Sequence, residues 1–102
     1  MNRQELTNKV KESIRAIDPN ARVILFGSRA RGNDKTISDW DFLILTSIQT
    51  NETLKRQFRD MLIETELEAE EVISTLIYSQ DTWENYKVTP LYKNILRDGI
   101  EV

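Results

Sequence analysis

The chain has 102 residues, with 39% hydrophobic and 30% charged side chains, a net charge of −3, no cysteine and no histidine. This composition is ordinary for a globular domain, and it excludes disulfide frameworks, thiolate or imidazole metal sites, and catalysis by cysteine or histidine. The acidic balance argues against general nucleic-acid binding, and the length predicts one domain over residues 1–102.

The N-terminal segment predicts an amphipathic helix over residues 4–17. Its apolar residues recur at the spacing of one helical face: Leu6, Val10, Ile14 and Ile17. Pro19 ends this helix, because proline lacks an amide and restricts the residue before it. The segment lacks the apolar core of a signal peptide, and no stretch is long and apolar enough to span a bilayer. We therefore expect a cytoplasmic protein that does not enter a membrane.

Two apolar runs, residues 23–26 and 40–46, predict two strands. Residues two apart in a strand point to the same face, so the carboxylates of Asp39 and Asp41 should lie side by side. Like charges this close repel unless a cation lies between them, and Mg²⁺ prefers such oxygen ligands. The alternative is a strand entrance at which Asp39 caps a turn and Asp41 faces solvent.

Gly27 and Ser28 follow directly on the first strand. Glycine lets a backbone turn sharply or approach a ligand closely, and a short helix from Ser28 through Arg31 would direct amides and the serine hydroxyl toward a phosphate. We expect the two strands to run antiparallel, because only then do this turn and the aspartates meet at one edge of the sheet. The basic residues near enough in sequence to hold one triphosphate are Arg22, Arg29, Arg31 and Lys35.

The Gly-Ser turn, ten intervening residues and Asp39-Trp40-Asp41 match the signature G-S-x10-D-x-D. In these residues the chain resembles the polymerase-β-like nucleotidyltransferases, in particular their minimal single-domain members, often called MNT. The resemblance implies an α/β (α+β) fold, with a small mixed β-sheet and helices packed on it, similar to the palm of polymerase β.

The resemblance also implies an activity. The turn would bind ATP or another nucleoside triphosphate, Mg²⁺ would lie on the paired carboxylates, and a nucleoside monophosphate would pass to an acceptor with release of pyrophosphate. The expected nucleotide-binding residues are Gly27, Ser28, Arg29 and Arg31. The expected catalytic residues, which are also metal ligands, are Asp39 and Asp41.

After the second strand, the sequence predicts a helix and a third strand. The helix, capped by Thr50 or Asn51, should run to about Glu68 and form a crossover, and residues 72–78 are β-branched and aromatic. In the resembled family a later strand usually supplies a third acidic metal ligand, whereas the strand here offers only serine and threonine. Glu71, at the strand entrance, is the best candidate for this ligand. The alternative is a solvated acidic turn.

The last quarter of the chain predicts two short helices. Residues 81–84 have the form of a capping box that opens the first helix. Thr89 and Pro90 start the second, which should end near Gly99. We expect residues 100–102 to pair weakly or to fray.

The acceptor is not defined by these motifs. A chain this short leaves no room for an acceptor domain, so a second copy or another protein would supply that surface. Minimal members of the resembled family often pair with a helical HEPN protein as the antitoxin of a toxin–antitoxin module, and some transfer AMP to a tyrosine of the toxin. The alternative is a degenerate member that binds a nucleotide or a partner protein without catalysis.

Overall fold

The computed structural model describes residues 1–32 and 39–102, so Lys35 of the expected basic cluster lies outside the described residues. The elements in chain order are α1 (Arg3–Ile17), β1 (Arg22–Phe26), β2 (Trp40–Thr46), α2 (Glu52–Ala69), β3 (Ile73–Ser79), α3 (Gln80–Trp83), the 3₁₀ helix η1 (Glu84–Tyr86), α4 (Pro90–Asp98) and β4 (Ile100–Glu101). Within the described ranges, none of these helices is long and apolar enough to cross a membrane.

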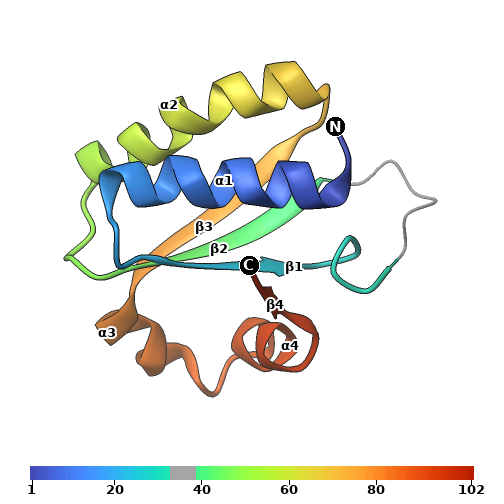
Figure 1. Cartoon of the computed structure of the whole chain (residues 1–102). Coiled ribbons are helices and arrows are strands. Elements are labelled where there is room, and N and C mark those ends of the chain that lie inside the picture. The colour runs from blue at the N-terminus through green and yellow to red at the C-terminus, as the bar shows by residue number, and fades with distance from the viewer. Residues whose placement is uncertain (33–38) are drawn as a thin grey trace.

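The strands form one mixed sheet in the order β3-β2-β1-β4 (Figure 1). β1 and β2 run antiparallel, as predicted, with Phe26 opposite Asp41. β2 and β3 run parallel, with Asp41 opposite Ser74, because α2 crosses over between them. The short β4 pairs antiparallel with β1, as expected for the C-terminal residues. The predicted mixed sheet with helices packed on it is confirmed.

The sheet separates two hydrophobic clusters. Figure 1 shows α1 and α2 over one face of the sheet and α3 and α4 against the other. Since side chains alternate along a strand, Trp40 and Phe42 of β2 enter the cluster under α1 and α2, whereas Leu43 and Leu45 enter the cluster on the α4 side. Asp41 and Leu43 are two residues apart in β2, so their side chains point to the same face of the sheet. The carboxylate of Asp41 therefore lies on the face covered by α3 and α4.

The two long helices follow their capping and apolar signals. The side chain of Asn51 accepts a hydrogen bond from the backbone amide of Leu54 and so caps α2, one of the two caps predicted. On the predicted apolar face of α1, Leu6, Val10 and Ile14 are buried and Ile17 is partly buried. Met61 of α2 is 41% exposed and lines a groove beside Ile17 of α1.

Of the two predicted C-terminal helices, only the first begins at a different residue. The hydroxyl of Ser79 accepts a hydrogen bond from the amide of Thr82 and so caps α3, in place of the predicted Asp81, because β3 leads directly into the helix. Thr89 caps α4 by accepting the amide of Tyr92, as predicted. Gly99 directly follows the end of α4, also as predicted.

Asp18 ties the end of α1 to the end of β2. Its carboxylate is buried, and it accepts hydrogen bonds from the amide and hydroxyl of Ser47 at 2.7 and 2.6 Å and from the amide of Asn20 at 3.2 Å. A buried carboxylate is tolerated only when it has such partners. These bonds fix the end of the sheet that lies farthest from Gly27.

Candidate functional site

Antiparallel pairing brings the turn after β1 against the start of β2. Phe26 is opposite Asp41, so Gly27 lies at the same end of the sheet as the two aspartates. Gly27 has φ +77°, in the left-handed region, and a Cβ built on it would overlap the Asp41 carboxylate. Glycine is therefore required here twice, for the backbone angle and for the close approach.

Residues 27–32 form a single turn and not the short helix expected after Ser28. The amides of Ala30 and Arg31 both donate to the carbonyl oxygen of Gly27, at 3.1 and 3.2 Å. Gly32 closes the turn with φ +82°, so left-handed residues bound it on both sides and interrupt the helical conformation. The amides of Ala30 and Arg31 are consequently bonded within the turn, so these two are not among the free amides expected to form a phosphate cradle.

Asp39 and Asp41 lie on the same face of the sheet. Ser74 of β3 is the register partner of Asp41, and its hydroxyl donates to Oδ2 of Asp39 at 2.9 Å. By strand alternation, Ser74 shares its face with Leu76, which packs in the cluster on the α4 side. Three oxygen-bearing side chains therefore meet at this end of the sheet.

The charge of the Asp41 carboxylate is poorly compensated. Burial raises the pKa of Asp41 above its ordinary value, the neighbouring charge of Asp39 raises it further, and the positive charge of Arg31 acts in the opposite direction. A cation placed between the two carboxylates would remove this penalty.

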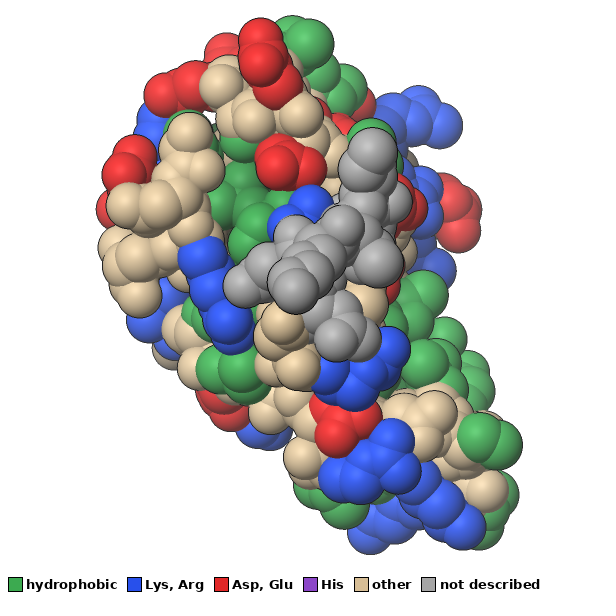
Figure 2. Space-filling model, turned by 90° about the vertical axis from the view of Figure 1, so that its right-hand side faces the viewer, with side chains coloured by type: hydrophobic (Ala, Val, Ile, Leu, Met, Phe, Trp, Pro, Cys, Tyr) green, Lys and Arg blue, Asp and Glu red, His purple; other side chains and the backbone are tan. Residues whose placement is uncertain are grey.

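Arg31 connects the turn to α4. Its guanidinium group lies 4.0 Å from the carboxylate of Asp98, and its side chain is 48% exposed. Figure 2 views the molecule from this end, and both acidic and basic side chains lie on the face it presents. Arg31 is thus a cation at the rim of the site, close enough to influence Asp41.

Arg29 lies toward the other face of the sheet. Its guanidinium carbon is 4.6 Å from the ring centroid of Trp40, and its nitrogen is 3.4 Å from the carboxylate of Glu71. Trp40 belongs to the cluster under α1 and α2, and the Arg29 side chain is only 12% exposed. Arg29 therefore holds the turn to the sheet through a cation–π contact and an ion pair.

The structure does not bring Glu71 to the aspartates. Glu71 precedes β3 and pairs with Arg29, which lies over Trp40 of the cluster under α1 and α2, on the face opposite to Asp41. Among residues 1–32 and 39–102, no three acidic side chains gather closely enough to hold a metal ion together. The residue of β3 that faces the aspartates is Ser74. Sequence reasoning missed it because the register between β2 and β3 cannot be read from either strand alone.

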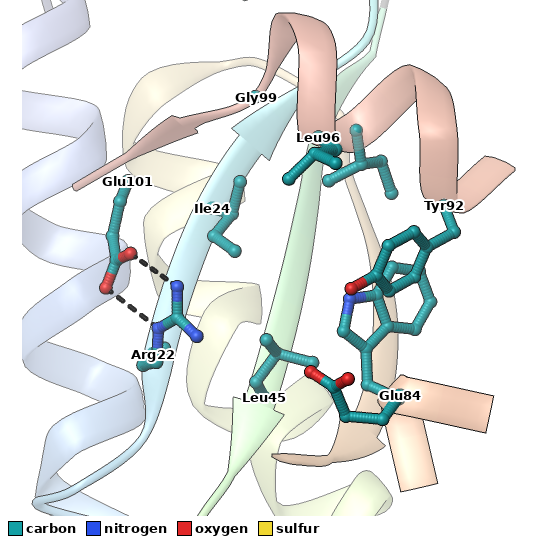
Figure 3. Close-up of a pocket in the computed structure, with 10 residues that line it drawn as sticks. Arg22, Ile24, Leu45, Glu84, Tyr92, Leu96, Gly99 and Glu101 are labelled. Atoms are coloured by element: carbon teal, nitrogen blue, oxygen red, sulfur yellow. Dashed lines mark hydrogen bonds and ion pairs between the residues drawn. The ribbon is translucent and has the colours of Figure 1, made fainter. Parts of the chain in front are cut away.

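Arg22 lies away from this site, because it starts β1 whereas Gly27 follows the end of β1. Its guanidinium donates to the carboxylate of Glu101 at 2.8 and 3.1 Å (Figure 3). This pair lines a pocket of about 240 Å³ whose apolar wall includes Ile24 and Leu45. The pocket is smaller than the roughly 300–1,000 Å³ of typical ligand sites. The charges of Arg22 and Glu101 already neutralise each other. This pocket is therefore a weaker candidate for the functional site than the end of the sheet that carries Asp39 and Asp41.

Comparison with known proteins agrees with this geometry. The model of the nucleotidyltransferase domain family matches residues 7–102. A crystal structure of a toxin–antitoxin with AMP-PNP has a similar fold, with a TM-score of 0.66 and 17% sequence identity, over 92% of this chain and 69% of that chain. No curated protein matches the sequence. The family resemblance drawn from the Gly-Ser and Asp-x-Asp motifs is therefore confirmed, and the structural likeness supports the fold.

Proposed function

Because the chain belongs to the nucleotidyltransferase domain family, we propose that it transfers a nucleoside monophosphate, AMP from ATP, to an acceptor and releases pyrophosphate. One observation carries the proposal: the side-chain-free turn at Gly27 lies directly against Asp41, on the face that Asp39 shares. Such an arrangement would bring a bound phosphate chain within reach of a charge-neutralising centre.

Asp39 and Asp41 are the residues that would hold Mg²⁺. Their chemistry fits, because Mg²⁺ in proteins is usually bound by one or two carboxylates, with substrate phosphates and water completing the octahedron. The raised pKa of Asp41 also fits, since it marks a carboxylate that is partly buried, lies near the charge of Asp39 and is only partly compensated by Arg31. When bound, Mg²⁺ supplies neutralisation of the triphosphate and acidification of the attacking hydroxyl. Glu71 could serve as a further ligand only after release from Arg29.

The turn of residues 27–32 would receive the phosphates. Gly27 offers bare backbone beside Asp41, Ser28 adds a hydroxyl, and Arg31 adds an exposed guanidinium group at the rim. Arg29 contributes to nucleotide binding by a different route, because its contacts with Trp40 and Glu71 keep the turn in place.

The reaction itself is a substitution at phosphorus. A hydroxyl oxygen of the acceptor forms a bond to the α-phosphorus while the bond from that phosphorus to the bridging oxygen breaks. Pyrophosphate leaves, and the hydroxyl proton passes to water. The protein contributes by positioning the phosphates and by matching the charge that develops on them.

We place the acceptor on a partner protein in the cytoplasm, a helical HEPN-type toxin for which this chain would be the antitoxin. One observation supports this assignment: a toxin–antitoxin structure shares the fold of this chain. A second copy of the chain is the other source of an acceptor surface.

The test uses ATP labelled at the α-phosphate, Mg²⁺ and the protein encoded next to this chain. We expect label to appear on the partner with the unmodified chain, and the Asp39→Asn and Asp41→Asn variants to lose transfer while their circular dichroism spectra stay unchanged. Asp81→Asn, an exposed aspartate at the opposite end of the sheet, is the matched control and should transfer normally. Undiminished transfer by both site variants would remove the proposal.

A second candidate function is a nucleotide- or partner-binding module without catalysis. The specific observation in its favour is that Ser74, and not a carboxylate, faces the aspartates from β3. Calorimetry of ATP binding with and without Mg²⁺ shows whether the chain binds nucleotide together with a metal, and the label-transfer assay then shows whether it also catalyses transfer. A module that binds only protein should give no metal-dependent heat, whereas one that binds nucleotide without catalysis should give such heat and no label transfer.

A further inference from the structure

We propose that Ser74 is a positioning residue that orients Asp39 toward a divalent cation shared with Asp41, an inference that rests on the proposed function. Asp39 precedes β2 and so is not itself held by the β1–β2 ladder. The Ser74 hydroxyl meets its Oδ2 at 2.9 Å and ties it to the neighbouring strand.

One hydrogen bond is enough to choose the orientation of this carboxylate. The terminal torsion of an aspartate is broad, so a carboxylate without a donor samples many orientations. A bond from Ser74 to Oδ2 fixes the plane of the Asp39 carboxylate relative to the sheet. Charge-assisted hydrogen bonds of this kind are also stronger than neutral ones.

The β2–β3 ladder places Ser74 against both aspartates at once. Ser74 is opposite Asp41 in the parallel register, and adjacent strands lie about 4.8 Å apart. The next side chains of β3 on this face, Leu76 and Tyr78, are apolar and pack in the cluster on the α4 side. Ser74 is therefore the residue of β3 that can act on the carboxylates.

A neutral hydroxyl at this position has a consequence for affinity. Asp41 lies near enough to Asp39 for their charges to repel, and Ser74 donates a hydrogen bond to Asp39 without adding a third charge. A carboxylate at the same position would increase repulsion in the free protein, but it would also add a charged ligand. Since affinity for a hard cation grows with the number of charged ligands, Ser74→Asp should bind the ion more tightly than the natural chain.

The experiment measures Mn²⁺ binding by calorimetry and by electron paramagnetic resonance, in the presence of an ATP analogue that cannot be cleaved between the α- and β-phosphates. Ser74→Ala should weaken Mn²⁺ binding by roughly tenfold, the size typical for loss of a residue that orients a metal ligand. Ser74→Thr keeps the hydroxyl and should bind as the natural chain does. Thr75→Ser is the matched control, because Thr75 has the parity of Ile73 and points to the opposite face.

The possible results distinguish a failure of the proposed function from a failure of the role of Ser74 alone. If the natural chain binds no Mn²⁺ with the analogue, the proposed function and this inference both fail. If the natural chain binds Mn²⁺ but Ser74→Ala binds it equally well, only the role of Ser74 is overturned. Unchanged or weaker binding by Ser74→Asp would also overturn the placement of residue 74 beside both carboxylates. A role in folding alone would lower the melting temperature of Ser74→Ala and leave its Mn²⁺ affinity unaltered.

Discussion

Gly27 and Asp41 lie so close that the carboxylate of Asp41 occupies the space in which a Cβ on residue 27 would stand. The contact joins the residue after β1 to a residue at the start of β2, and the Phe26–Asp41 pair of the ladder enforces it. The position of the Asp41 carboxylate and the absence of a side chain at residue 27 are therefore one feature of the structure.

Gly27→Ala should damage the site more than it damages the fold. Alanine at a left-handed φ costs about 1–2 kcal/mol, and the added methyl group must also push the Asp41 carboxylate aside. Gly32→Ala is the matched control, because φ there is +82° but a Cβ would meet no atom of residues 1–32 and 39–102 within 4 Å. We expect similar losses of unfolding free energy in urea denaturation, but loss of Mn²⁺–nucleotide binding only in Gly27→Ala. Equal binding by both variants would contradict this reading of the contact.

The unfolding free energy of the metal-free protein should depend on pH through Asp41. The pKa of this carboxyl is raised in the folded state, so the folded protein holds its proton more tightly than the unfolded chain does. The resulting stabilisation is complete below the ordinary aspartate pKa of about 3.9 and is lost as the pH rises through the folded value. In EDTA, the natural chain should therefore lose stability with rising pH relative to Asp41→Asn. Parallel curves of urea unfolding against pH for the two proteins would refute this.

Glu71→Gln distinguishes two roles for this carboxylate. If Glu71 is the partner of Arg29, its removal should cost up to about 1 kcal/mol of unfolding free energy and leave Mn²⁺ affinity unchanged. If it is a metal ligand, Mn²⁺ affinity should fall by roughly tenfold or more. The structure favours the first outcome. Glu70→Gln removes the same charge one residue earlier and controls for the change in net charge.

Asp18→Ala should destabilise the fold without altering the site. The substitution removes the acceptor of the amide and hydroxyl of Ser47 and of the amide of Asn20, at a cost of about 1–3 kcal/mol. Below the lowered melting temperature, Mn²⁺–nucleotide affinity should match that of the natural chain, because Asp18 lies at the other end of the sheet. Asp60→Ala, an exposed aspartate on α2, should change neither quantity. A loss of affinity in the folded Asp18→Ala protein would show that the two ends of the sheet are coupled.

The sequence by itself determined the elements and the motif. Capping residues, proline and the spacing of apolar side chains act over a few residues, so the helices beginning after Asn51 and Thr89 and the two strands around residues 27–39 could be read directly. The antiparallel pairing of β1 and β2 could also be predicted, because the turn at Gly27 and the carboxylate of Asp41 meet only if the two strands run in opposite directions. The Gly-Ser and Asp-x-Asp spacing was sufficient to identify the family.

The tertiary structure decided which side chains act together. Alternation gives each strand two faces, but only packing of α1 and α2 on the sheet decides which face Arg29 and Glu71 share, and which is left for Arg31. The role of Ser74 depends on the register between β2 and β3, which are separated along the chain by α2. A shift of one residue in that register would reverse every face, and its correct value is set by burial across the sheet and not by any local signal.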